Sequence, residues 1–337
     1  RPQRLAGSHG SAAHAIGRTL EGMVEYLAKQ LVASVLVLFL VMTATFFLVK
    51  LAPGQLSILA DPTMDPGVVA SVERRFGLDR PPAEQYVRWI GRMSQGDLGT
   101  SLVYGRPVLQ MITERLPATL LLGLAALVIT VLIGIPAGII AARWPNSPVD
   151  QVLSFIGIVG LATPNFWLGI LLIIFFSVTL GWLPGSGMQT IGQPFSLLDR
   201  ASYLILPAVV LATSTTAEIM RYTRSSWLEV MNLDFVRTAR SKGLAEPRVH
   251  LKHVFKNAFI PVLTILGLML PRLVGGSAIV ESLFSWPGIG SMAVNSAVSR
   301  DATVILGTTL FVSAGVIVSN LVIDVLYGIV DPRIRYD

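Results

Sequence analysis

The sequence predicts an all-α membrane protein with six transmembrane helices, and two observations carry that prediction. Of its 337 residues, 53% are hydrophobic and only 14% are charged, whereas an ordinary soluble domain has about 25% charged residues. Four long runs, at residues 30–49, 116–142, 151–198 and 302–323, contain no Asp, Glu, Lys or Arg. Because about 20 apolar residues cross a bilayer as a helix, each run is long enough to span a membrane.

The apolar runs divide into six predicted spans. They are residues 31–49, 116–142, 152–180, 203–219, 258–280 and 304–327. Before the first span, residues 1–15 are small and polar, and we expect them to be flexible. From Ile16 to Leu31 apolar residues recur at helical spacing. Segment 1–30 is therefore a flexible start followed either by an amphipathic helix along the membrane interface or by an extension of the first span.

The distribution of Lys and Arg predicts the orientation of the spans. The N-terminal segment, the 143–151 loop, the loop at 220–257 and the tail at 328–337 together carry fifteen of these residues, whereas the opposite short loops carry only Arg200 and Arg300. Positive loops stay in the cytoplasm. We therefore expect both termini and the 220–257 loop to be cytoplasmic.

Segment 50–115 then lies outside the membrane. It is rich in turn formers and contains a helical pattern at 83–93. Within that helix, we expect Tyr86 and Trp89 to form an aromatic anchor at the membrane interface.

The loop at 220–257 is far longer than a connection needs, since about five residues would suffice. Its polar, basic part predicts two short helices around a turn. Gly243 ends the first, because glycine adopts the left-handed conformation without strain. Pro247 suits the first turn of the second. We interpret this loop as a contact site for a cytoplasmic partner.

Two motifs concern how the helices pack. Gly134 and Gly138 are four residues apart on one helix face, which favours close contact with a neighbouring helix. Pro164 interrupts the third span, and a simple kink explains it better than a polar notch in which the adjacent Asn165 lines a pathway.

Three charged residues near membrane depth are further candidates for a pathway. An unpaired arginine at a helix centre costs about 2.5–3.5 kcal/mol, so Arg272 should face a water-filled path or a partner such as Glu281 or Glu218. Alternatively, the fifth span is shifted and Arg272 extends to the outer interface. Glu281 lies near a span end, where a capping or interfacial role would explain it.

The sequence offers little for catalysis or metal binding. It has no cysteine, and its four histidines are not paired with carboxylates at metal-ligand spacing. Ser186, which lies between two glycines, has no partner base that could activate it as a nucleophile. The sequence also has no glycine-rich phosphate loop. The sequence pI near 9.8 is explained by loop charges. We expect no catalytic residue, no metal site, no cofactor bound by this chain and no nucleic-acid partner.

Several separated motifs resemble one known family. They are Phe76-Gly-Leu-Asp79, Gln85-Tyr-Val-Arg-Trp-Ile90, Gly96-Asp-Leu-Gly-Thr-Ser101, Tyr104-Gly-Arg-Pro-Val108, Glu114-Arg-Leu-Pro-Ala-Thr119, Phe166-Trp-Leu-Gly169, Gly181-Trp-Leu-Pro184, Phe284-Ser-Trp-Pro-Gly-Ile-Gly290 and Asp331-Pro-Arg-Ile-Arg335. In this order they resemble the B-type transmembrane subunit of dipeptide, oligopeptide and nickel ABC importers. The resemblance runs from about residue 27 to the C-terminus.

The resemblance implies a type I ABC importer permease fold with its core at 116–327. It also implies a non-catalytic subunit that forms half of a pathway for di- or oligopeptides in the cytoplasmic (inner) membrane of a bacterium or archaeon. The implied partners are a C-type permease subunit, two ATPase subunits or domains that carry ATP and Mg²⁺, and an extracytoplasmic substrate-binding protein. The same architecture importing nickel or another small solute is an alternative. A secondary transporter or channel is another, although the paired intramembrane acids of such transporters are scarce here.

In such importers the long cytoplasmic loop holds a coupling helix that docks on the ATPase. Arg237-Thr238-Ala239 resembles the family's Glu-Ala-Ala, with Gly243 six residues on. Ala245 stands where close relatives often carry a capping serine, and Lys256 where many carry proline. The docking residues implied by the resemblance are Arg237, Thr238, Ala239, Arg240, Gly243, Leu244 and Arg248.

Overall fold

The computed structural model describes residues 8–51, 65–77, 79–275 and 277–330. These residues form helices and turns, with an isolated β-bridge between Thr100 and Pro107. In chain order the helices are α1 (Ser8–Leu51), α2 (Pro66–Phe76), α3 (Pro82–Met93), α4 (Val108–Ile129), α5 (Ile135–Arg143), α6 (Pro148–Ala162), α7 (Asn165–Leu172), α8 (Leu197–Met231), α9 (Asp234–Ser241), α10 (Glu246–Arg248), α11 (Phe255–Gly275), α12 (Ser277–Leu283), α13 (Ile289–Ser299) and α14 (Ala302–Val330). Three π-helical stretches continue α4, α7 and α10: η1 (Thr130–Gly134), η2 (Ile173–Thr179) and η3 (Val249–Val254). The all-α prediction is confirmed.

Among the described residues, five helical segments are long and apolar enough to cross a membrane. They are Ala28–Leu51, Val108–Arg143, Leu197–Met231, Glu246–Met269 and Ala302–Val325. A sixth span exists only if α6 and the α7–η2 segment are counted together, and these are bent by 104°. The structure therefore has five or six candidate spans.

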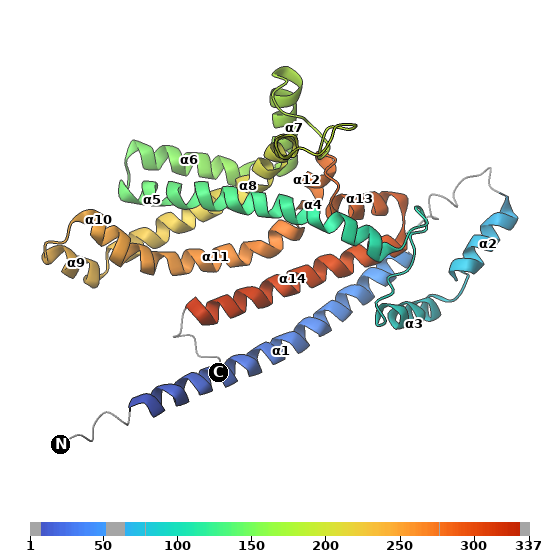
Figure 1. Cartoon of the computed structure of the whole chain (residues 1–337), viewed down its shortest axis with the longest axis horizontal. Helices are drawn as coiled ribbons and strands as arrows, with labels where there is room; N and C mark the ends of the chain where they lie inside the picture. Colours follow the sequence, from blue (N-terminus) through green and yellow to red (C-terminus); the bar gives the residue numbers. More distant parts are fainter. Residues whose placement is uncertain (1–7, 52–64, 78, 276, 331–337) are drawn as a thin grey trace.

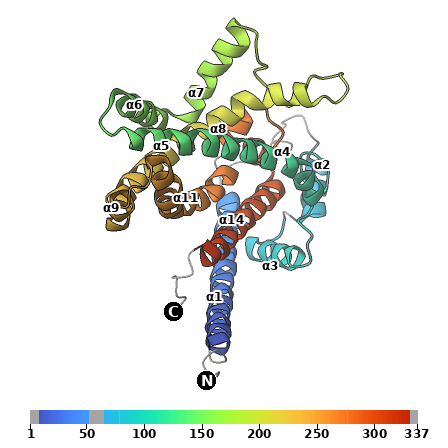
Figure 2. The ribbon, with the colours of Figure 1, turned by 60° about the vertical axis from the view of Figure 1, so that its left-hand side comes forward.

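The third predicted span, residues 152–180, consists of two helical segments separated at Pro164, so the prediction of a simple kink there understates the bend. Thr163 is extended, with φ −82° and ψ 120°, as expected for the residue before a proline. Pro164 has no amide hydrogen for the helical ladder, and α7 starts again at Asn165. The proline break is far sharper than a kink. The α7–η2 segment rises away from the layer that contains α4, α5 and α8 (Figure 2), while α7 keeps contact with α8 and α12.

The long helix α8 lies among the other membrane helices. It packs against α4, α5, α6 and α11, while α14 packs between α11 and α1 (Figure 1). The predicted close contact at Gly134 and Gly138 is confirmed. A Cβ atom on Gly138 would lie 2.6 Å from the Met220 carbonyl oxygen of α8, and one on Gly134 would lie 2.9 Å from that of Thr216.

Several helix boundaries differ from the prediction. The chain is helical from Ser8, so residues 8–15 are not a flexible start and α1 extends the first span without a break. Helix α8 continues to Met231, twelve residues beyond the predicted end of its span, because leaving the membrane does not oblige a helix to stop. The predicted fifth span contains the end of α11 at Gly275 and the start of α12.

The helix predicted at 83–93 is confirmed as α3, and its aromatic residues pack against α1. The Trp89 ring is 7% exposed and stacks on Phe46 of α1 with 5.6 Å between ring centroids. The Tyr86 hydroxyl lies 2.7 Å from the Thr43 hydroxyl oxygen. These residues attach α3 to α1, and their place relative to a membrane stays a prediction.

Candidate functional site: the helical loop between α8 and α11

The first short helix of the long loop ends as predicted. Gly243 has φ +73°, its amide donates to the Arg240 carbonyl at 2.9 Å, and the Leu244 amide donates to the Ala239 carbonyl at 3.4 Å. This pair of hydrogen bonds is the Schellman motif, which satisfies carbonyls at a helix C-terminus. A β-branched residue would resist the positive φ of Gly243. The turn therefore depends on glycine.

The second short helix begins at Glu246, with Pro247 in its first turn as predicted. The capping residue Ala245 offers no side-chain hydrogen bond. Instead, Glu246 accepts from Arg240 Nε at 2.8 Å, which ties α10 to α9. Both side chains are partly exposed, so this pair contributes about 0.2–1 kcal/mol.

The inner face of the loop packs against the ends of the membrane helices. A buried cluster, here called the loop core, joins α5, α8, α9, η3 and α11, with members Ala142, Trp227, Val230, Val236, Ala239, Val249, Val254 and Ala258. Two implied docking residues belong to this inner side: Ala239 is 5% exposed and Leu244 packs half-buried against the cluster. They hold α9 in place rather than form its outer surface. The short helices are thus fixed to the spans, which allows force applied to them to reach α8 and α11.

The outer face presents both basic and apolar side chains. Five implied docking residues are exposed, namely Arg237, Thr238, Arg240, Gly243 and Arg248. Sequence reasoning missed three large apolar residues on or beside the short helices: Leu233, Phe235 and Leu251 are 45%, 40% and 73% exposed. The available signal was their position in an otherwise polar loop. Exposed apolar residues rimmed by polar ones are typical of a protein interface.

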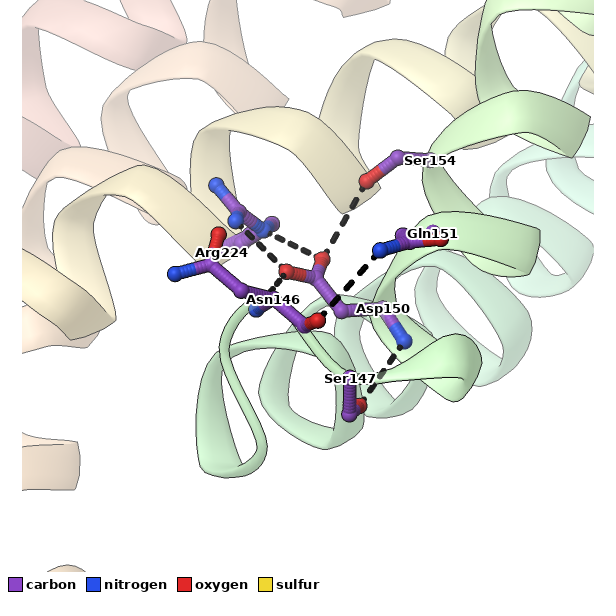
Figure 3. Close-up of polar contacts among 6 residues, drawn as sticks. All are labelled: Asn146, Ser147, Asp150, Gln151, Ser154 and Arg224. Atoms are coloured by element: carbon purple, nitrogen blue, oxygen red, sulfur yellow. Dashed lines mark hydrogen bonds and ion pairs between the residues drawn. The ribbon is translucent and has the colours of Figure 1, made fainter.

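A buried ion pair near this loop was also missed, and Figure 3 shows it. Asp150, at the start of α6, is 3% exposed and receives two hydrogen bonds from Arg224 of α8, at 2.6 and 2.7 Å (Figure 3). The Asn146 amide and the Ser154 hydroxyl also donate to it, at 2.8 and 3.2 Å. Such a two-pronged arginine–carboxylate contact is strong and directional.

This ion pair, here called the α6–α8 clamp, lies two turns of α8 before the short helices. The sequence signal was Ser147 three residues before Asp150, the spacing of a helix cap. The Ser147 hydroxyl does accept from the Asp150 amide at 3.3 Å. The partner 74 residues away could not be read from that local pattern.

The four candidate pathway residues lie on different elements. Asn165 begins α7 and Glu218 lies on α8, and both are half-buried. Arg272 lies in α11, and its side chain is outside the described part of the structure. Glu281 lies on α12 and is fully buried, so it faces no open path in this conformation.

Glu281 instead caps another helix, which was the alternative considered for it. Its carboxylate accepts from the Ser291 amide in the first turn of α13 and from the Thr119 hydroxyl, both at 2.9 Å. Thr119 in turn accepts from the Ile289 amide at 2.8 Å. The Glu281 carboxylate lies so close to the Gly288 backbone that a Cβ atom on Gly288 would be 2.2 Å from Glu281 Oε2. This packing explains the need for glycine in the Phe284–Gly290 motif.

No group of three or more His, Cys, Asp or Glu residues able to hold a metal ion is present in the part of the chain that the structure describes.

Comparison with known families gives two matches that together cover most of the chain. Residues 134–336 match the binding-protein-dependent transport system inner membrane component, and residues 23–123 match the N-terminal part of such membrane components. The oligopeptide transport system permease protein AppB of Bacillus subtilis is 44% identical over 316 residues, which are 93% of this chain and 100% of the relative. The glutathione transport system permease protein GsiC of Escherichia coli K12 is 41% identical over 315 residues, with the same shares.

Solved structures agree on the fold. An inward-facing structure of the MetNI methionine ABC transporter superposes with a TM-score of 0.53, at 16% identity, over 66% of this chain and 97% of the solved one. A second crystal form of that transporter gives a TM-score of 0.51 over the same shares. At this identity the likeness concerns the fold alone.

Proposed function

Because the chain belongs to the family of binding-protein-dependent transport system inner membrane components, as a B-type permease subunit of peptide ABC importers, we propose that it forms half of a translocation pathway for di- or oligopeptides. The proposed substrate follows its relatives, which are named for oligopeptide, peptide and glutathione transport. A C-type permease subunit would supply the other half of the pathway. An external substrate-binding protein would deliver the peptide, and both termini would lie in the cytoplasm.

The observation that carries the proposal is the loop between α8 and α11. Its two short helices are held by the loop core, while Arg237, Phe235 and Leu251 remain exposed. We propose that this outer face docks on an ATPase subunit, on which ATP and Mg²⁺ bind. Basic side chains around an apolar centre would provide both orientation and contact area. Movement of the ATPase would then shift α8 and α11 as rigid bodies.

The docking proposal is tested by changing the turn at Gly243 in the assembled transporter. A Cβ atom there meets nothing within 4 Å, so only the φ of +73° opposes a larger residue. Gly243→Val should shift the turn and reduce peptide-stimulated ATP hydrolysis and uptake at least tenfold, because α9 would no longer hold its orientation. Gly243→Asn is the matched control, since asparagine tolerates the left-handed conformation. Equal, near-normal uptake by both variants would exclude docking through this turn.

We also propose that Asn165, Glu218 and Arg272 line the pathway, since polar groups at membrane depth are costly unless they serve one. Wild-type uptake by Arg272→Leu at normal expression would remove Arg272 from this set.

A further inference from the structure

A basic cavity lies at the end of the molecule opposite the α9–α10 loop. Its volume is about 510 Å³, and it is formed where the end of α1 meets α2, α3 and the first residues of α14. Five cationic residues line it: Lys50, Arg74, Arg80, Arg88 and Arg92. No Asp or Glu is among its lining residues. The volume falls in the range of about 300–1,000 Å³ that is usual for small-molecule sites.

In the part of the chain that the structure describes, two of these cations have a carboxylate partner. Arg80 and Arg88 both pair with Glu84, at 2.6 and 3.0 Å. The hydrogen bond from Arg80 lowers the pKa of Glu84, which keeps this carboxylate charged. Within the described residues, no ion pair joins Lys50, Arg74 or Arg92 to an acid. Among the described residues, the cavity lining therefore carries more positive than negative charge.

Such a cavity is suited to an oxyanion. Several arginines around one space can each offer paired N–H groups to phosphate oxygens, a geometry that a guanidinium matches well. Polar side chains of Gln95, Thr100 and Thr303 also line the space and can complete the hydrogen bonding. One side of the lining is apolar, with Phe46, Trp89 and Leu306. A ligand with an anionic head and an adjoining apolar part would match both sides.

The position of Lys50 indicates where such a ligand comes from. The apolar segment Ala28–Leu51 has 24 residues and is about 36 Å long at 1.5 Å per residue. The hydrocarbon core of a bilayer is about 30 Å thick, so Lys50 lies at the depth of lipid headgroups. Beside it on α1, Leu48 and Leu51 are 66% and 78% exposed, an apolar surface on which acyl chains can lie.

We propose that this cavity binds a phosphate group, and that the phosphate belongs to the headgroup of an anionic phospholipid. The headgroup would contact Lys50, Arg74 and Arg92, and its acyl chains would follow the exposed face of α1. The bound lipid would fasten the external helices α2 and α3 to the membrane end of α1. This role is separate from the transport of peptide and does not depend on it.

The test measures lipid binding by the full-length chain in neutral detergent. Short-chain phosphatidylglycerol, short-chain phosphatidylcholine, glycerol 3-phosphate and inorganic phosphate are titrated separately by calorimetry. Each basic residue near a headgroup contributes about 1 kcal/mol. The Arg74→Gln/Arg92→Gln variant should therefore bind phosphatidylglycerol about thirtyfold more weakly. The matched control removes the same charge from the same predicted external segment but outside the cavity, by Arg106→Gln/Arg115→Gln, and should change binding less than threefold.

The outcomes separate the two sources of phosphate. Tight binding of phosphatidylglycerol alone, lost in the cavity variant and kept in the control, supports the proposal. Equally tight binding of inorganic phosphate or glycerol 3-phosphate, lost in the same variant, would overturn the lipid source and leave a site for a soluble anion. Equal affinities in wild type and cavity variant would overturn the site itself. If the double variant does not fold, Arg92→Gln alone, at an exposed position, should still weaken binding about fivefold.

Discussion

The α6–α8 clamp should be a main energetic link between the start of α6 and helix α8, which leads into the loop between α8 and α11. Replacing Arg224 with glutamine removes the positive charge and the paired N–H donors of the guanidinium, while keeping a polar side chain. Asp150 would remain 3% exposed, with hydrogen bonds from the Asn146 amide and the Ser154 hydroxyl only. A buried carboxylate that loses its cation is strongly destabilising.

The size of the effect follows from the two lost bonds. Hydrogen bonds to charged groups contribute about 1.5–3 kcal/mol each, and breaking a fully buried pair costs about 3–5 kcal/mol. The side chain of Arg224 is 30% exposed, so water offsets part of the loss. We expect Arg224→Gln to lower the free energy of unfolding by about 3 kcal/mol.

A double-mutant cycle isolates the pair itself. Asp150→Asn alone should cost about 2 kcal/mol, since Asn146 and Ser154 still find a neighbouring oxygen. The double variant should be little worse than either single one, which gives a coupling energy of about 2 kcal/mol. The free energy of unfolding of Arg224→Lys should lie between those of the wild type and Arg224→Gln, because lysine keeps the positive charge but lacks the paired N–H donors of the guanidinium.

The assay is denaturant unfolding of the purified chain in mixed micelles, followed by circular dichroism. In the assembled transporter, the same variants should reduce coupling of ATP hydrolysis to peptide, because Arg224 lies seven residues before the end of α8. Additive effects, with a coupling energy below about 0.5 kcal/mol, would refute the argument that the two side chains act as one clamp.

Two further predictions concern packing that the structure makes unusually close. Gly290→Ala should destabilise the chain by about 2–3 kcal/mol, because its Cβ atom would lie 2.5 Å from the Ala278 backbone Cα, which cannot rotate away. The control is Gly123→Ala, whose Cβ atom would meet nothing within 4 Å. In thermal unfolding this control should be neutral or stabilising. Trp89→Ala should cost about 3–5 kcal/mol through the cavity it leaves between α1 and α3, whereas Trp182→Ala, at a 69% exposed position, should cost less than 1 kcal/mol. Equal unfolding temperatures within either pair would contradict the packing described for it.

Local sequence chemistry anticipated the ends of the short loop helices. Gly243 and Pro247 act through their own backbone conformations, and the Schellman turn and the helix start need no distant partner. For the same reason Pro164 could be identified as a break in the third span. Pro164 by itself did not indicate the size of the bend between the two segments, which is 104°.

The surroundings of individual polar and aromatic residues could not be predicted, because their contacts come from distant parts of the chain. Tyr86 and Trp89 were predicted to form an aromatic anchor, but no local pattern indicated that Phe46 of α1 covers the Trp89 ring. Glu281 was a candidate for the pathway, yet it lies enclosed against Thr119 and Ser291. In both cases the surroundings of the side chain depend on which element folds over it, and a local pattern does not contain that information.

The sequence by itself determined the class of protein, the approximate membrane segments and the two-helix form of the loop between α8 and α11. Each of these follows from local physics: the length of apolar runs against bilayer thickness, and the backbone preferences of glycine and proline. Only the tertiary structure decided which faces of the loop are exposed, that Asp150 and Arg224 meet across 74 residues, and that five cations surround one cavity. These are long-range contacts, selected by the packing of whole helices, and no local pattern encodes which partners will meet.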